Sequence, residues 1–259
     1  MTIKTKPSSI SDFNSILDKD YEDLNTKIES WYPIMYYNEN IVLEDKNYIT
    51  MGINPSLTDN AKQAINKIFE IKQFNVENDS KGDERFNKFN SNRQIKKKLI
   101  EFQNKLKYEA EDQIEYFKTL EYFFKSVCKN FEKDVFHYDF CQLRNTDSKN
   151  IKNEIKIKGN YEKLCIHFDM ISELIKPDYI FIFNATLFKI LLKRDFFERV
   201  NHDIIDKDDF QYYNEFIDDN GVCKRNGMKF IVGNQLSGGA TSRVYRANLI
   251  ANVRRLLNS

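Results

Sequence analysis

The chain has 259 residues, of which 41% are hydrophobic and 14% aromatic, and this composition excludes a largely disordered chain. Its formal net charge of +1 gives no overall indication of a nucleic-acid-binding protein. No apolar run approaches the roughly 20 residues of a membrane-spanning helix, and the polar N-terminus lacks the apolar region of a signal peptide. We therefore expect a cytoplasmic protein without membrane association.

Short apolar runs alternate with longer segments of helical periodicity along the chain. The runs that predict strands are 41–43, 48–53, 135–140, 179–183 and 230–232. The segments that predict helices are 10–30, 61–71, 95–106, 110–131, 161–175, 186–192 and 240–257. Such alternation is typical of a mostly parallel sheet covered by helices on both faces.

The predicted domain organisation is simple, because no Pro/Gly/Ser-rich linker divides the chain. We expect a single domain over residues 1–259, with a helical N-terminal extension over 1–30. The polar, aperiodic stretch 75–92 predicts an exposed loop or insertion. Asn220 and Gly221 predict a turn that leads into the last strand.

The most informative segment is Met51-Gly52-Ile53-Asn54-Pro55-Ser56, which ends the strand predicted at 48–53. Gly52 permits close approach of the backbone, and Pro55 restricts Asn54 to an extended conformation. The carboxyl end of a strand is also where open α/β sheets bind ligands. The segment therefore predicts an amide side chain aimed at a ligand site.

Two further segments place polar groups after predicted strands. Asp139 lies near the end of the strand predicted at 135–140, and Arg144 follows that strand. Asp139 can accept hydrogen bonds from a ligand and Arg144 can reach a phosphate. Alternatively, Asp139 is a turn residue and Arg144 belongs to a surface ion pair. The segment Gly233–Arg243 joins the last strand to the last helix, and Gly238 and Gly239 allow a sharp turn there. It is either a tight connection or a loop that contacts DNA through the first amides of the helix.

The distribution of basic residues, cysteines and histidines gives further expectations. From residue 221 onward the chain contains seven Lys or Arg residues and no Asp or Glu, which indicates either phosphate binding or a solvated helix face. The four cysteines lack a Cys-x-x-Cys pair and the three histidines lack ligand spacing, so we expect no metal and no cofactor.

Together and in this order, the segments resemble the motifs of the uracil-DNA glycosylase superfamily. Gly52-Ile53-Asn54-Pro55 is similar to the first motif of its mismatch-specific thymine/uracil branch. The segments at 135–144 and 176–184 are similar to the next two strands, and Gln235–Arg243 resembles the DNA-intercalation loop. The resemblance covers the chain from about Trp31 to the C-terminus. The expected fold is a three-layer α/β/α sandwich around a mostly parallel four-stranded sheet.

The resemblance implies a role for each matching residue. Asn54 positions the attacking water, and Arg144 and Arg246 bind phosphates. The base would be bound by Ile53, Ser56, Asp139 and Asn184. The loop contacts to DNA would come from Gln235, Ser237, Gly238, Gly239, Thr241, Ser242 and Arg243. Candidates for the aromatic ring that stacks on the base are Phe86, Phe89, Tyr116 and Phe117.

Two departures from the family pattern bear on the substrate. Gln235 stands where the family commonly has His, so no imidazole is ready to stabilise the leaving base. Asp139 stands where an Asn usually contacts the base, and an ionised carboxylate only accepts hydrogen bonds. Acceptance from an exocyclic amine suits a cytosine-like base better than uracil.

Three interpretations of the sequence remain open. The first is a monomeric, monofunctional DNA glycosylase that acts on double- or single-stranded DNA in repair or in defence against foreign DNA. The second is a glycosylase-like module that binds nucleic acid or a protein without cleaving. The third is an unrelated α/β hydrolase or nucleotide-binding enzyme, although the phosphate-loop and Gly-x-Ser-x-Gly motifs are absent.

Overall fold

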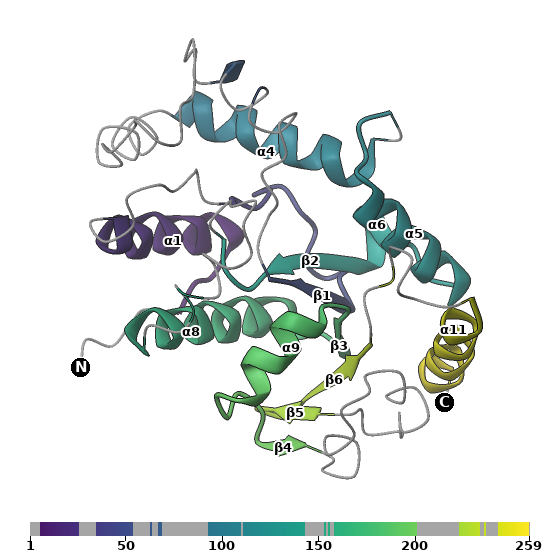
Figure 1. Cartoon of the computed structure of the whole chain (residues 1–259). Coiled ribbons are helices and arrows are strands. Elements are labelled where there is room, and N and C mark those ends of the chain that lie inside the picture. Colours follow the sequence, from purple (N-terminus) through teal and green to yellow (C-terminus); the bar gives the residue numbers. More distant parts are fainter. Residues whose placement is uncertain are drawn as a thin grey trace. The chain divides into compact units, whose positions relative to one another are not determined.

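The computed structural model describes residues 6–25, 35–53, 63, 67–68, 93–109, 111–142, 153, 155, 158–200, 223–233, 236 and 243–258 (Figure 1). Its helices are α1 (Ile10–Asn25), α4 (Arg93–Tyr108), α5 (Glu115–Ser126), α6 (Phe131–Asp134), α8 (Lys158–Ile175), α9 (Ala185–Leu192) and α11 (Arg243–Leu257). Its strands are β1 (Tyr48–Gly52), β2 (Val135–Asp139), β3 (Tyr179–Ile182), β4 (Arg199–Val200), β5 (Cys223–Arg225) and β6 (Met228–Val232). None of the helices in these ranges has the length and apolar character needed to cross a membrane.

The chain forms two compact units that alternate along the sequence. The first consists of Met1–Ile41, Asn54–Lys105 and Asp139–Leu174, and the second of Val42–Ile53, Leu106–Tyr138 and Ile175–Ser259. The second unit contains nearly all of the sheet. Each unit has its own buried core, described below.

The sheet has six strands in the order β2-β1-β3-β6-β5-β4. Strands β1, β3 and β6 are parallel, with Met51 beside Ile182 and Ile182 beside Val232. The carboxyl ends of these three strands are therefore level. Strands β5 and β4 continue the sheet in antiparallel pairs. The α/β class and the mostly parallel sheet core are confirmed.

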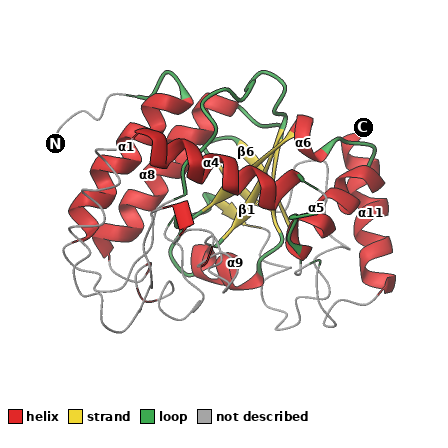
Figure 2. Cartoon of the chain, turned by 90° about the horizontal axis from the view of Figure 1, so that it is seen from above, coloured by secondary structure: helices red, strands yellow, loops and turns green. Residues whose placement is uncertain are grey.

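Helices of the second unit cover both faces of the sheet. Phe181 of β3 faces α5, where Phe124 lies 5.2 Å from it between ring centroids. Ile180 directly precedes Phe181 in β3, so its side chain points to the opposite face of the sheet. Phe230 of β6 is the register partner of Ile180 and shares that face. On that face Phe230 packs against Phe197, which contacts Phe188 of α9. The three-layer arrangement is thus present within this unit, and Figure 2 gives a second view of its strands and helices.

The strand count differs from the four predicted, because β4 and β5 join the sheet. These strands are only two and three residues long, and β5 is the polar sequence Cys-Lys-Arg. Neither has the apolar run on which strand prediction depends. The turn between β5 and β6 is Asn226-Gly227, where both residues have positive φ (49° and 78°). The turn predicted at Asn220-Gly221 lies outside the described residues.

Two other predicted elements were wrong in detail. Residues 41–43 form no strand: Val42 is 56% exposed, and the amide of Lys46 donates to the carbonyl of Leu43 in a turn. The helix predicted over 110–131 is divided into α5 and α6. The division is at Cys128, which adopts a left-handed φ of 61°, and at Asn130, whose side chain caps α6 by accepting from the Lys133 amide.

The first unit is built around α1 and α8. The buried residues of α1 recur at helical spacing: Ile10, Phe13, Leu17 and Tyr21. Phe13 meets His167 of α8 edge to face, with ring centroids 6.3 Å apart. The helix predicted in 1–30 is therefore part of this core. The stretch 75–92 lies outside the described residues.

Candidate functional site

The carboxyl ends of β1, β3 and β6 form the expected ligand-binding edge of the sheet. From β1 the chain goes to β2 on one side and afterwards to β3 on the other, so the strand order reverses between β1 and β3. A reversal of this kind leaves a crevice at the carboxyl ends of the two strands, where open α/β sheets bind their ligands. Ile53, Asn184 and Gly233 follow these three strands within one or two residues.

The connection beyond β6 is fixed to β3. The amide of Gly233 donates to the carbonyl of Ile182 at 3.0 Å, which extends the parallel pairing by one residue. Leu236, further along the same segment, is buried with 4% of its surface exposed. The segment predicted to contact DNA therefore starts at the same edge as the Gly-Ile-Asn-Pro turn.

Many predicted site residues lie outside the described part of the chain. Ile53, Asp139, Asn184, Arg243 and Arg246 are described. The residues outside it are Asn54, Ser56, Arg144, Gln235, Ser237, Gly238, Gly239, Thr241 and Ser242. Asn54 directly follows Ile53, a buried residue that is 8% exposed.

Asn184 has a clear local role as the N-cap of α9. Its Oδ1 accepts from the Leu187 amide at 2.9 Å, satisfying one of the free donors at the start of the helix. The side chain is half-buried. A ligand at this edge could therefore contact the amide nitrogen of Asn184 or the second lone pair of its oxygen.

Asp139 lies within the first unit, at the end of β2, and is 4% exposed. Its backbone carbonyl accepts from Nε2 of Gln142 at 3.0 Å. The Oε1 of Gln142 accepts in turn from the hydroxyl of Tyr21 at 2.5 Å. The backbone amide of Gln142 donates to the same hydroxyl at 3.0 Å. The backbone that carries Asp139 is thus held to α1 by buried hydrogen bonds.

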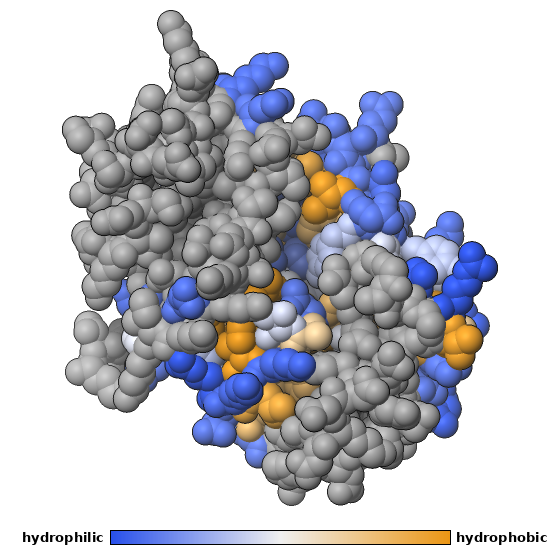
Figure 3. All heavy atoms as spheres, viewed as in Figure 1, coloured by the Kyte–Doolittle hydropathy of each residue, from blue (hydrophilic) through white to orange (hydrophobic). Residues whose placement is uncertain are grey.

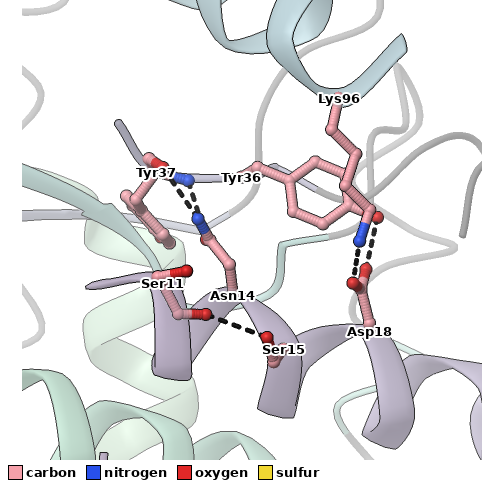
Figure 4. A network of polar contacts seen from close by, with 7 residues as sticks. All are labelled: Ser11, Asn14, Ser15, Asp18, Tyr36, Tyr37 and Lys96. Carbon is pink, nitrogen blue, oxygen red and sulfur yellow. Dashed lines mark hydrogen bonds and ion pairs between the residues drawn. The ribbon is translucent and has the colours of Figure 1, made fainter. Parts of the chain in front are cut away.

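Tyr37 is the titratable neighbour of Asp139. Burial raises the pKa of its hydroxyl well above the ordinary value, and the Asp139 carboxylate raises this pKa further. Asn14 holds the Tyr37 backbone with both ends of its amide: Nδ2 donates to the carbonyl at 2.8 Å and Oδ1 accepts from the amide at 3.0 Å (Figure 4). The residue beside Asp139 is therefore fixed as well.

A second polar group in Figure 4 joins three further residues of the first unit. The Tyr36 hydroxyl donates to Oδ1 of Asp18 at 2.6 Å, and Lys96 of α4 forms an ion pair with Oδ2 of the same carboxylate. The ammonium of Lys96 also lies 5.1 Å from the centre of the Tyr36 ring. Burial foremost, and then the Asp18 charge, raises the pKa of Tyr36 well above its usual value. This group joins α1 to α4.

Two histidines form buried pairs that the sequence did not indicate. Nε2 of His167 lies 2.8 Å from Oδ2 of Asp20 in the first unit. Nδ1 of His137 lies 2.9 Å from Oγ1 of Thr50 in the second. The partners are 147 and 87 residues apart in sequence, so no local pattern predicts them. Among the described residues, no group of three or more His, Cys, Asp or Glu side chains is placed to hold a metal ion.

Two of the four stacking candidates are described, and both contact His137. Phe117 meets its ring edge to face at 4.9 Å and is 7% exposed, so it is a core residue rather than a free stacking surface. Tyr116 lies 5.6 Å from the same ring. Phe86 and Phe89 lie outside the described residues.

A pocket of about 490 Å³ occurs in the second unit, away from the predicted site. Its lining residues are Tyr108, Glu121, Lys125, Cys128, Lys129, Asn130, Phe131 and Glu132. The Lys129 ammonium lies 5.5 Å from the ring of Tyr48, the first residue of β1. The pocket is therefore at the amino end of that strand, whereas the predicted site is at the carboxyl ends.

The chain matches no model of a known protein family, and it matches none of the curated proteins with which its sequence was compared. The resemblance to the uracil-DNA glycosylase superfamily accordingly rests on the motifs in the sequence and on their positions along the strands.

Proposed function

We propose that this protein is a monofunctional DNA glycosylase that hydrolyses the N-glycosidic bond of a flipped base. One observation carries the proposal. The turn that leads to Asn54 and the segment that leads to Arg243 leave neighbouring parts of one sheet edge, on either side of β3. An extruded nucleotide needs both a catalytic turn and a loop that fills the gap in the stack, close to one another.

The proposed chemistry requires little from the protein beyond positioning. Cleavage of the bond between the sugar and the base develops positive charge on the sugar, and a water then attacks its anomeric carbon. The Asn54 amide would orient this water by hydrogen bonding. An amide is a poor base, so the enzyme would forgo part of the roughly 10²–10⁴-fold acceleration that a general base supplies. A slow, selective enzyme is expected.

The proposed substrate is a damaged or modified base, with a cytosine-like base favoured over uracil. Asp139 would accept a hydrogen bond from the exocyclic amine, since an ionised carboxylate has no proton to donate to a carbonyl. The negative charge of Asp139 acts on Tyr37, whose pKa it raises. A cytoplasmic, monomeric enzyme of DNA repair, or of defence against foreign DNA, is the proposed setting.

A second candidate is a catalytically weak or inactive glycosylase-like module that binds nucleic acid or a protein partner. Gln235 favours this candidate, because it replaces the imidazole that would stabilise the leaving base. The capping role of Asn184 favours it too, since that role needs no substrate. The retained Asn54 favours the enzyme.

The test is excision of bases from a panel of labelled duplexes that carry uracil, mispaired thymine, deaminated purines or modified cytosines. Alkali-labile abasic sites are scored after incubation with protein produced in a host that lacks its own uracil-excising enzyme. The proposal expects abasic sites in at least one duplex, most readily with a cytosine-like base. Tight binding to the panel without any abasic product would instead support the binding module.

A further inference from the structure

In the part of the chain that the structure describes, the outer face of α11 carries exposed arginines and no carboxylate. Its exposed positions recur at helical spacing: Arg243, Val244, Ala247, Asn248, Ala251, Arg254 and Arg255. The opposite side of the helix is buried through Leu249, Val253 and Leu256, which are at most 5% exposed. The helix is therefore fixed in the core of the second unit, and its orientation presents the arginines to solvent.

No carboxylate offsets these arginines within their own part of the chain. From residue 221 to the C-terminus the sequence has no Asp or Glu. In Figure 3 the region of α11 shows hydrophilic atoms with only a small apolar area. Val244, a large apolar residue of the outer face, is 69% exposed. Such a surface fits a polyanion rather than an apolar partner.

The neighbouring helix extends the charge at the far end of this face. A guanidinium nitrogen of Arg254 donates to the carbonyl of Ser126, the last residue of α5. This contact brings the exposed Lys125 to the same end. Glu121, one turn earlier, is hydrogen bonded to Nε2 of Gln113 at 2.9 Å.

We propose that the outer face of α11 binds the phosphate backbone of duplex DNA, a proposal that rests on DNA being the substrate. Arg243 opens the helix directly after the loop proposed to enter the DNA, and Arg255 is about 18 Å further along the axis at 1.5 Å per residue. A rigid rod with charges at both ends suits a stiff duplex with a major groove about 12 Å wide between its two backbones. Ala247, Asn248 and Ala251 are exposed between these two charges, and the half-exposed Arg246 lies one turn after Arg243.

Single-stranded DNA fits this face less well. Proteins that bind single strands combine positive charge with aromatic rings on which successive bases stack. Among the described residues, the exposed side chains of α11 are arginine, alanine, asparagine and valine. The exposed Tyr122 of α5, one turn before Ser126, provides a single ring rather than the series on which successive bases stack. The face therefore assigns a double-stranded substrate to the enzyme, with phosphate contacts that carry no base specificity.

The test introduces a charge of either sign in the middle of the face. Ala251→Glu and Ala251→Lys alter the same exposed helical position with residues of similar helix propensity. Changes of opposite sign in DNA affinity would therefore report charge rather than folding. Binding to an undamaged labelled duplex of about 20 base pairs is measured by fluorescence anisotropy from about 50 to 200 mM salt. Ala251→Glu should weaken binding about five- to tenfold at the low end, and Ala251→Lys should leave it equal or tighter.

A third variant counts a phosphate contact directly. The slope of log K against log salt is negative. Arg255→Gln should reduce its magnitude by about 0.9, the value for one phosphate contact. An unchanged slope, equal behaviour of the two Ala251 variants, or the absence of DNA binding at low salt would overturn the assignment. Tighter binding of a single strand or an RNA duplex with the same sensitivity would overturn the choice of duplex DNA.

The two proposals fail separately. Base excision that continues while all three variants bind DNA like the wild type would refute the role of α11 and leave the glycosylase intact. A charge-dependent loss of binding in a protein that excises no base would refute the glycosylase and retain this surface.

Discussion

At the scale of single residues, the proposed function makes Asp139 the residue that selects the class of base. Replacement by Asn adds a hydrogen-bond donor and removes the charge, so Asp139→Asn should shift the preference from cytosine-like bases towards uracil. The expected change in the ratio of the two excision rates is about 10- to 100-fold, the range for a polar group left without its partner. The ratio is measured in single-turnover excision from two otherwise identical duplexes.

Asp178→Asn is the matched control for this substitution. Asp178 directly precedes β3 and therefore lies at the opposite end of the strands from the proposed site. Its replacement should leave the ratio of rates unchanged. A ratio that stays constant in both variants would show that Asp139 does not select the base.

Tyr108 makes stability depend on pH in the alkaline range. Burial, and secondarily the Glu132 charge, raise the pKa of its hydroxyl to about 12, against 10.0 ordinarily. The folded state therefore keeps a proton that the unfolded state releases first, so stability present below pH 10 is lost as the pH rises towards 12. Between pH 9 and 11 the wild type should lose about 1 kcal/mol more of its free energy of unfolding than Tyr108→Phe does.

Urea unfolding of the wild type and Tyr108→Phe at several pH values measures this difference. The ring contact with Phe131, at 5.8 Å between centroids, involves no hydroxyl and is available to Phe as well. Parallel pH profiles for the two proteins would show that this hydroxyl ionises as freely in the folded state as in the unfolded chain.

The sequence predicted side chains at strand ends far better than buried polar pairs. Asp139 lies near the end of one apolar run and Asn184 directly follows another, and both ends can be located by inspection. The pairing of Asp20 with His167, or of Thr50 with His137, follows only from the way distant elements meet. Asn184 shows a further limit, because a strand-end amide in a ligand position and an N-cap have the same sequence appearance.

At the scale of elements, the β5–β6 hairpin depends on the turn at Asn226-Gly227, where both residues have positive φ. A Cβ at Gly227 would meet no atom within 4 Å, yet the residue has a φ of 78°. Gly227→Ala should therefore destabilise the protein by about 1 kcal/mol through backbone strain alone.

Gly159 in α8 is the matched control, because a Cβ there also meets no atom within 4 Å, and no positive φ is involved. Gly159→Ala should stabilise the protein by about 0.4 to 1 kcal/mol, because alanine lowers the conformational entropy of the unfolded chain. Urea midpoints at constant slope give both values. A shift of the same sign in both variants would contradict the backbone explanation.

Strand prediction succeeded where the run was continuously apolar and failed where tertiary pairing decided. Strands β1, β2, β3 and β6 lie within one or two residues of the apolar runs that predicted them. Strands β4 and β5 are short, and they pair because the hairpin at Asn226-Gly227 brings them to the sheet. The run at 41–43 has hydrophobic residues but no strand partner.

Strand order is the decisive feature at the scale of the whole molecule. The sequence predicted an α/β fold with motifs at strand ends, and the order β2-β1-β3-β6 adds the reversal between β1 and β3. No single segment encodes that reversal, because it depends on which side of β1 each later strand joins. The interleaving of two compact units is likewise a property of the complete chain path.

In the proposed enzyme, Asn54, which follows Ile53, steers water to the sugar of an extruded nucleotide. The most direct measurement is the single-turnover rate of abasic-site formation by Asn54→Ala, with affinity for the same duplex determined in parallel. We expect the excision rate of Asn54→Ala to fall by about 10²-fold or more, while its affinity for the duplex stays within a few-fold of the wild type. Excision at the wild-type rate in this variant would contradict this role of Asn54.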